Sequence, residues 1–235
     1  PVANQTLQSD VMNNLFYIKG NVDGYSSEKA WRIDDTDPTS PTNHNIFNDR
    51  YERNGAKEII FTEAEFCPES TSDCHIFIEH IDLRESKVYI ENERRPVVLH
   101  LKNPSGSNGT FQLSDDALIC GVNKGETDCN NKPERFVIVG DSDSDNVARE
   151  TSCGISSLSL KIGENNIPHS FILLKDGSVE LTSPTSINGA IWAKNICANS
   201  NKLDVTIPSN FMPTVYDLWG WKDIEFAGLG RSIRR

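Results

Sequence analysis

The sequence predicts an all-β protein, a parallel β-helix or solenoid in which short strands stack in successive coils. Short apolar runs, such as residues 171–174 and 203–207, alternate with small polar turns that contain Gly, Asn or Pro, a pattern typical of β proteins. Phe171 and Ile191 each open such a run and lie 20 residues apart, which suits one coil of a stack of strands. The expected inward or interface positions are Phe171, Leu173, Val179, Leu181, Ile191 and Ala193.

Strand-like runs continue along the chain before this repeat. Apolar β-formers occupy residues 59–61, 76–78, 88–90, 97–101, 111–113, 117–119, 136–139 and 155–162. Residues 1–70 form a polar, irregular N-terminal region, with one possible strand at 15–19 and a loop at 34–43, and we expect it to wrap or cap the solenoid. The solenoid domain covers residues 71–235, and the aromatic segment 211–226 is expected to cap its other end.

The overall charge restricts the kinds of partner. The 235 residues carry a net charge of −11, with a pI of about 4.9. Because an acidic surface repels phosphate, direct binding of nucleic acid is disfavoured. No apolar run approaches the ~20 residues that a membrane-spanning helix needs.

The six cysteines indicate disulfides in an exported protein. Two pairs bracket short polar loops, and the remaining pair would join neighbouring coils. Six cysteines allow fifteen connectivities, and we prefer the pairing Cys67–Cys74, Cys120–Cys129 and Cys153–Cys197. A zinc site is the alternative, although no C-x-x-C spacing supports it.

One acidic turn is the candidate metal site. Asp141, Asp143 and Asp145 directly follow a predicted strand, and alternate carboxylates converge on calcium at the start of an EF-hand loop. The loop departs from that pattern, since Asn146 replaces Gly and Ser152 replaces the final Glu. A solvated acidic turn is the alternative, which we favour. We therefore expect no cofactor, and calcium at this turn is the alternative to that expectation.

Sugar binding and catalysis have weaker candidates. Trp219 and Trp221 flank one glycine and share a face in an extended segment, so they suit either stacking on sugar rings or capping of the solenoid. The histidines match no nucleophile motif and are interpreted as ordinary polar residues. Glycoside hydrolysis needs two placed carboxylates, and no pair stands out among the 34 acidic residues.

The sequence resembles the β-solenoid passenger domains of bacterial type IV minor pilins and pseudopilin-like proteins of the PilX and ComZ type, including cyanobacterial relatives. The resemblance begins at about Glu93. Five segments carry it: residues 189–194 (GAIWAK), 95–101, 109–114, 133–140 and the closing 218–223 (LWGWKD).

This resemblance implies a non-enzymatic domain exported to the cell surface, where it supports pilus assembly, adhesion, motility or DNA uptake. Its partners would be other pilus subunits and, in addition, surface polysaccharide. It also implies an apolar pilin helix before Pro1, which would provide the contact with the membrane. Two alternatives from other classes are a polysaccharide-active β-helix enzyme and a carbohydrate-binding module.

Overall fold

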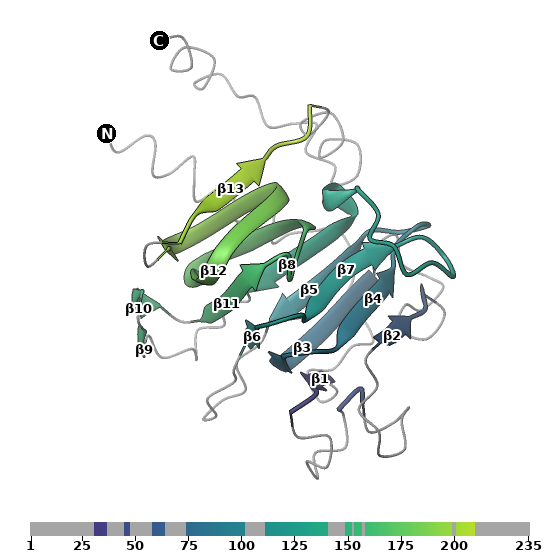
Figure 1. The fold of residues 1–235 in the computed structure, drawn as a ribbon, viewed down its shortest axis with the longest axis horizontal. Coiled ribbons are helices and arrows are strands. Elements are labelled where there is room, and N and C mark those ends of the chain that lie inside the picture. Colours follow the sequence, from purple (N-terminus) through teal and green to yellow (C-terminus); the bar gives the residue numbers. More distant parts are fainter. Residues whose placement is uncertain are drawn as a thin grey trace. The chain divides into compact units, whose positions relative to one another are not determined.

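A computed structural model of the chain describes residues 31–36, 45–47, 58–63, 74–101, 111–140, 149–151, 153–156, 158–198 and 201–209. The elements defined there are strands β1 to β13 and one 3-10 turn, η2 (Pro133–Arg135), and Figure 1 shows their arrangement. All the strands lie in one compact unit that spans Gly20–Pro208. Within the described residues, no helix is long and apolar enough to cross a membrane.

The first row of strands contains β3 (Cys74–Leu83), β5 (Val97–Leu101), β8 (Phe136–Gly140) and β12 (His169–Cys197). Each pairs with the next in parallel, and β3 contributes its first half. Because side chains alternate along a strand, every second position points inward. One such inward set, paired in register across the row, is Ile76, Leu99, Ile138 and Ile172.

The second row contains β1 (Trp31–Asp34), the second half of β3, β6 (Phe111–Leu113), β11 (Ser159–Glu164), β12 and finally β13 (Leu203–Thr206). All these pairings are parallel. The inward positions that face one another are Ile33, Ile81, Phe111, Leu160 and Val179. Because β3 and β12 each belong to both rows, the pairing order of the larger sheet closes on itself.

The third row is a separate sheet of three parallel strands, β2 (Glu58–Phe61), β4 (Lys87–Glu91) and β7 (Leu118–Val122). Its inward positions, Ile59, Val88 and Ile119, join the inward residues of the other two rows in one apolar cluster. Each fully buried aliphatic side chain contributes about 1.5–3 kcal/mol to folding. The three rows therefore enclose a common core, and the predicted all-β class with parallel strands is confirmed.

Four of the six predicted inward positions are buried, and they lie on more than one face. Val179 and Leu181 lie in the central cluster, and Ile191 and Ala193 pack against it. Phe171 and Leu173 are buried, but they lie outside that cluster. Their neighbours Ile172 and Leu174 fill the core instead. The repeat therefore predicts the position of the strand correctly. At residues 171–174, however, the side chains that face the core are those one position later than predicted.

Three other expectations change in detail. The predicted run of short strands in residues 171–193 is one long strand, β12, because the chain stays extended through its turns and pairs in succession with β8, β11 and β13. The predicted strand 155–162 is divided between β10 (Gly154–Ser156) and β11, and β10 pairs in a hairpin with β9 (Arg149–Thr151). Asp34, expected in a loop, ends β1.

The region before residue 71 contributes strands to the same sheets. β1 pairs with β3 and extends the second row, while β2 pairs with β4 and extends the third. The strand expected at residues 15–19 lies outside the described residues, as does the predicted cap at 211–226.

Within the described residues, two disulfides join strand residues to neighbouring loops, one over a short and one over a long stretch of chain. Cys120 bonds to Cys129 across 9 positions, with 5.6 Å between their Cα atoms. Cys153 bonds to Cys197 across 44 positions, with a Cα separation of 5.4 Å. Both pairings agree with the prediction. Cys74 is also disulfide-bonded, whereas its predicted partner Cys67 lies outside the described residues.

Candidate functional site

A line of polar side chains follows the outer face of the second row, and we call it the polar ladder. Because inward and outward positions alternate, the residue after each inward position of this row points away from the core. In register, these outward residues are Asp34, Asp82, Gln112, Lys161 and Glu180. Neighbouring strands lie about 4.8 Å apart, so consecutive members of the ladder are within reach of one another.

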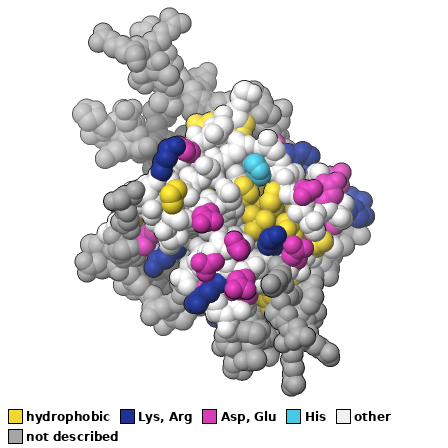
Figure 2. All heavy atoms as spheres, in the orientation of Figure 1, with side chains coloured by type: hydrophobic (Ala, Val, Ile, Leu, Met, Phe, Trp, Pro, Cys, Tyr) yellow, Lys and Arg dark blue, Asp and Glu magenta, His cyan; other side chains and the backbone are white. Residues whose placement is uncertain are grey.

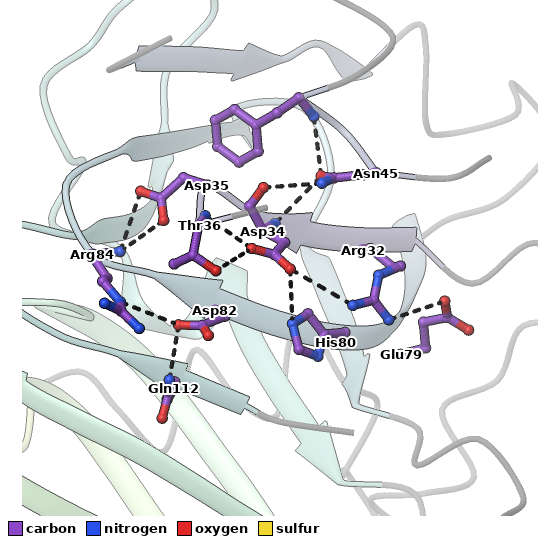
Figure 3. Close-up of polar contacts among 11 residues, drawn as sticks. Arg32, Asp34, Asp35, Thr36, Asn45, Glu79, His80, Asp82, Arg84 and Gln112 are labelled. Carbon is purple, nitrogen blue, oxygen red and sulfur yellow. Dashed lines mark hydrogen bonds and ion pairs between the residues drawn. The ribbon is translucent and has the colours of Figure 1, made fainter. Parts of the chain in front are cut away.

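Asp34 is held at one end of the polar ladder by several donors (Figure 3). Its carboxylate accepts hydrogen bonds from the backbone N–H of Thr36 at 2.9 Å and from the Thr36 hydroxyl at 2.8 Å. His80 Nε2 lies 3.3 Å from the other carboxylate oxygen, and an Arg32 nitrogen lies 3.7 Å from it. The Asp34 side chain is only 6% exposed, so these internal partners satisfy most of its capacity to accept.

Asp82 and Gln112 form the middle of the polar ladder. Gln112 Nε2 donates to Asp82 Oδ1 at 2.9 Å, and Arg84 Nε lies 4.0 Å from the same oxygen. The Arg84 side chain is 58% exposed. This part of the ladder therefore presents a charged guanidinium to solvent beside a fixed carboxylate and amide (Figure 3).

Glu180 is anchored at the other end. Ser159 Oγ donates to Glu180 Oε1 at 2.6 Å, and Lys161 Nζ lies 3.9 Å from Oε2. The Glu180 side chain is nearly buried, whereas that of Lys161 is 43% exposed. A recessed carboxylate thus orients an accessible ammonium group.

Each carboxylate of the polar ladder lies beside a cationic side chain. Arg32, Arg84 and Lys161 contact Asp34, Asp82 and Glu180 respectively, and Arg32 also contacts Glu79. The space-filling view likewise shows acidic and basic side chains interspersed on the face that it presents (Figure 2). In the described part of the chain, no group of three or more His, Cys, Asp and Glu side chains is placed to hold a metal ion. The arrangement offers both donors and acceptors of hydrogen bonds.

A pocket of about 280 Å³ lies beside the loops that connect β11, β12 and β13. Lys202 Nζ contacts Asp204 Oδ2 at 2.7 Å on its wall. The complete lining is Glu164, Asn165, Pro184, Thr185, Ser186, Lys202 and Asp204. All of these residues except Pro184 are polar, most belong to β11, β12 and β13, and the lining contains no aromatic side chain.

Two histidines meet on the outer side of the first row. His75 Nδ1 lies 2.8 Å from His100 Nε2, and the His100 ring stacks on Phe77 with 4.7 Å between centroids. Their contact depends on the register between β3 and β5, and this register could not be predicted from the local sequence. Elsewhere, burial lowers the pKa of His169, and burial followed by the charge of Glu58 raises the pKa of Tyr89.

The remaining predicted site residues lie outside the described residues. They are the calcium candidates Asp141, Asp143 and Asp145 and the aromatic pair Trp219 and Trp221. The polar ladder was missed because its members are scattered from residue 34 to residue 180. A signal was present nevertheless: every member of the ladder except Asp34 stands between two apolar core residues, as Lys161 does between Leu160 and Ile162.

No protein-family model, curated protein or solved structure matches this chain. The functional argument therefore depends on the fold, the polar ladder and the motifs of the sequence.

Proposed function

We propose that this chain is the exported, non-enzymatic β-solenoid domain of a type IV minor pilin or pseudopilin-like protein. In this proposal the rows of parallel strands are the faces of a solenoid. The domain displays a rigid surface among other pilus subunits, at a filament tip or along the filament. Such a surface would support pilus assembly, adhesion, motility or DNA uptake.

The observation that carries the proposal is the environment of Gly189, which opens the segment 189–194. Gly189 has φ = +149°, and a Cβ atom there would collide with the backbone oxygen of Ser170. Glycine is the residue that tolerates both conditions. The segment that carries the pilin resemblance thus begins where two parts of β12 approach closely.

Spacing within the second row also supports stacked coils. Ser178 N donates to Leu158 O, and the Thr182 hydroxyl donates to Ile162 O. Asn201 Nδ2 donates to Leu181 O. The hydrogen bonds of the Thr182 and Asn201 side chains each connect residues 20 positions apart. A repeated separation of this size is expected when each coil of a solenoid pairs with the next.

The disulfides support export. Cysteine pairs such as Cys120–Cys129 and Cys153–Cys197 form and persist in oxidising compartments and are rare in the cytosol. The polar ladder supports a display role, because its carboxylates at Asp34 and Glu180 are nearly buried and already bonded internally. A catalytic carboxylate would instead need access to its substrate.

Localisation in the source organism tests the proposal. Antibodies against the domain should detect it in the filament fraction released by mechanical shearing, and this signal should disappear when the pilus assembly ATPase is deleted. A secreted protein unrelated to pili serves as the control, and its level should not change. Detection of the chain in the cytosol, or an unchanged signal in the assembly mutant, would refute the pilus assignment.

A further inference from the structure

We infer that the polar ladder, together with Arg84 and Ser159, is a binding surface for a neutral polysaccharide chain. This inference goes beyond the pilus assignment, because it concerns the outer face of the second row and can be tested on the isolated chain. The ligand class follows from the charge, accessibility and spacing of the side chains on this face.

The charge pattern selects a neutral partner. The protein as a whole carries −11, so anionic polymers are repelled at long range. Each of the three ladder carboxylates already contacts a cationic side chain, and Glu79 shares Arg32 with Asp34. A cationic chain would compete with these internal cations, and an anionic chain would meet the ladder carboxylates, so either charge opposes association.

The hydrogen-bonding groups suit hydroxyls. Each sugar hydroxyl donates one hydrogen bond and accepts others, so it needs both kinds of partner on the protein. Asp82 supplies carboxylate acceptors, Gln112 supplies an amide with both functions, and Lys161 and Arg84 supply donors. These groups stand side by side in register across β3, β6 and β11.

The side chains are both fixed and accessible. Gln112 is oriented by its hydrogen bond to Asp82, and Lys161 lies beside Glu180. Contacts of this kind reduce the entropy lost when a ligand binds. Arg84 and Lys161 are nevertheless 58% and 43% exposed. The polar groups of this surface are therefore preorganised for binding.

The shape of the site favours an extended chain over a single sugar. Five strands carry the ladder from Asp34 to Glu180, and at about 4.8 Å per strand the ladder spans roughly 19 Å. The polar ladder runs across the strands, so successive sugar units would contact side chains of successive strands. The ligand we infer is thus a linear neutral glycan of several units.

Binding can be measured by isothermal titration calorimetry with the full chain. Cellohexaose, mannohexaose and xylohexaose serve as neutral probes, and a galacturonate hexamer serves as the acidic comparison. We expect at least one neutral hexamer to bind and the acidic hexamer to bind at least tenfold more weakly. No binding of any neutral hexamer, or tighter binding of the acidic one, would overturn the inference.

Variants locate the site. Lys161→Ala and Gln112→Ala should each weaken binding of the neutral hexamer by about fivefold to tenfold, because each removes a polar contact. Lys87→Ala is the matched control, since Lys87 has 41% exposure and also pairs with a glutamate, but on β4 in the third row. It should leave the affinity unchanged, and equal losses in Lys161→Ala and Lys87→Ala would contradict the site.

Arg84→Ala provides an independent check on folding. Its side chain is the most exposed of the three cations that contact ladder carboxylates and makes only a long contact with Asp82, so the variant should keep the melting temperature of the parent. Weaker binding with an unchanged melting temperature supports the site. Unchanged binding in Arg84→Ala, Lys161→Ala and Gln112→Ala together would place the glycan elsewhere and refute the inference.

Discussion

Two buried asparagine side chains, Asn92 and Asn166, stabilise turns between strands of different rows by hydrogen bonds. Asn92 is fully buried, accepts from Asn130 Nδ2 at 2.6 Å and donates to the carbonyl of Arg135 at 3.1 Å. Asn166 likewise accepts from Gly163 N at 2.7 Å and donates to Ala117 O at 2.6 Å. Buried backbone groups require partners. Asparagine supplies both a donor and an acceptor where the chain leaves one sheet row for another.

Gly189 gives the first residue-scale prediction. Replacing Gly189 with Ala places a Cβ against the Ser170 carbonyl at a positive φ, so the free energy of unfolding should fall by about 2–4 kcal/mol. Urea denaturation measures this change. Gly125→Ala is the control, because Gly125 also has a positive φ of 73° but no atom near its added Cβ, and it should cost only about 1 kcal/mol. Equal losses would contradict the steric argument.

His169 gives a pH-dependent prediction. Burial lowers its pKa in the folded state below the ordinary value of 6.5. As the pH falls below 6.5, the unfolded state therefore binds a proton at His169 before the folded state does. The free energy of unfolding decreases over this pH range and stops decreasing, as far as His169 is concerned, once the pH is below the folded pKa. Urea denaturation between pH 7.5 and 5 should show a steeper loss for the parent than for His169→Gln. Parallel curves would show that His169 does not contribute.

At the scale of the element, Asp35 fixes the turn between β3 and β4. Its carboxylate accepts hydrogen bonds from the backbone N–H groups of Arg84, Glu85 and Ser86, at 2.9 to 3.2 Å. The turn therefore depends on a residue that directly follows β1, far away in sequence. This contact connects the end of β1 with the turn that leads into β4, the central strand of the third row.

Substitution of Asp35 tests this connection. Asp35→Ala removes the acceptor for three backbone donors and should lower the free energy of unfolding by about 1–2 kcal/mol, since water replaces part of the bonding. Asp35→Asn keeps one carbonyl oxygen and should lose about half as much. Asp204→Ala, which removes only the exposed pair with Lys202, should change stability by less than about 0.5 kcal/mol. Chemical denaturation that gave the same loss for Asp35→Ala and Asp204→Ala would exclude this role.

Strand positions were predictable because their signals are local. The apolar runs at 97–101, 111–113 and 136–139 match β5, β6 and β8 closely. β1 was missed, because its four residues include Arg32 and Asp34 and stand beside a loop-like composition. Its pairing with β3 provides the partners that its own sequence does not specify. The register that assembles the polar ladder is equally non-local.

At the scale of the whole molecule, the two described disulfides close loops of very different length. Removing Cys153–Cys197 by double substitution with serine frees a loop of 44 positions, whereas removing Cys120–Cys129 frees one of 9. If a disulfide acts mainly on the entropy of the unfolded chain, the losses should be about 4 and about 2.6 kcal/mol respectively. Thermal or urea denaturation of the two double variants measures them. A larger loss for the short loop would show that local packing outweighs chain entropy.

The same long disulfide has a mechanical consequence. When the chain is pulled from its two ends, tension passes from Cys153 directly to Cys197 through the covalent bond. The segment between them, which contains β10, β11 and nearly all of β12, cannot be drawn out even after its hydrogen bonds break. At about 3.4 Å per extended residue, the 44 positions keep roughly 150 Å of contour length in reserve. Reduction of one bond would release that length under load.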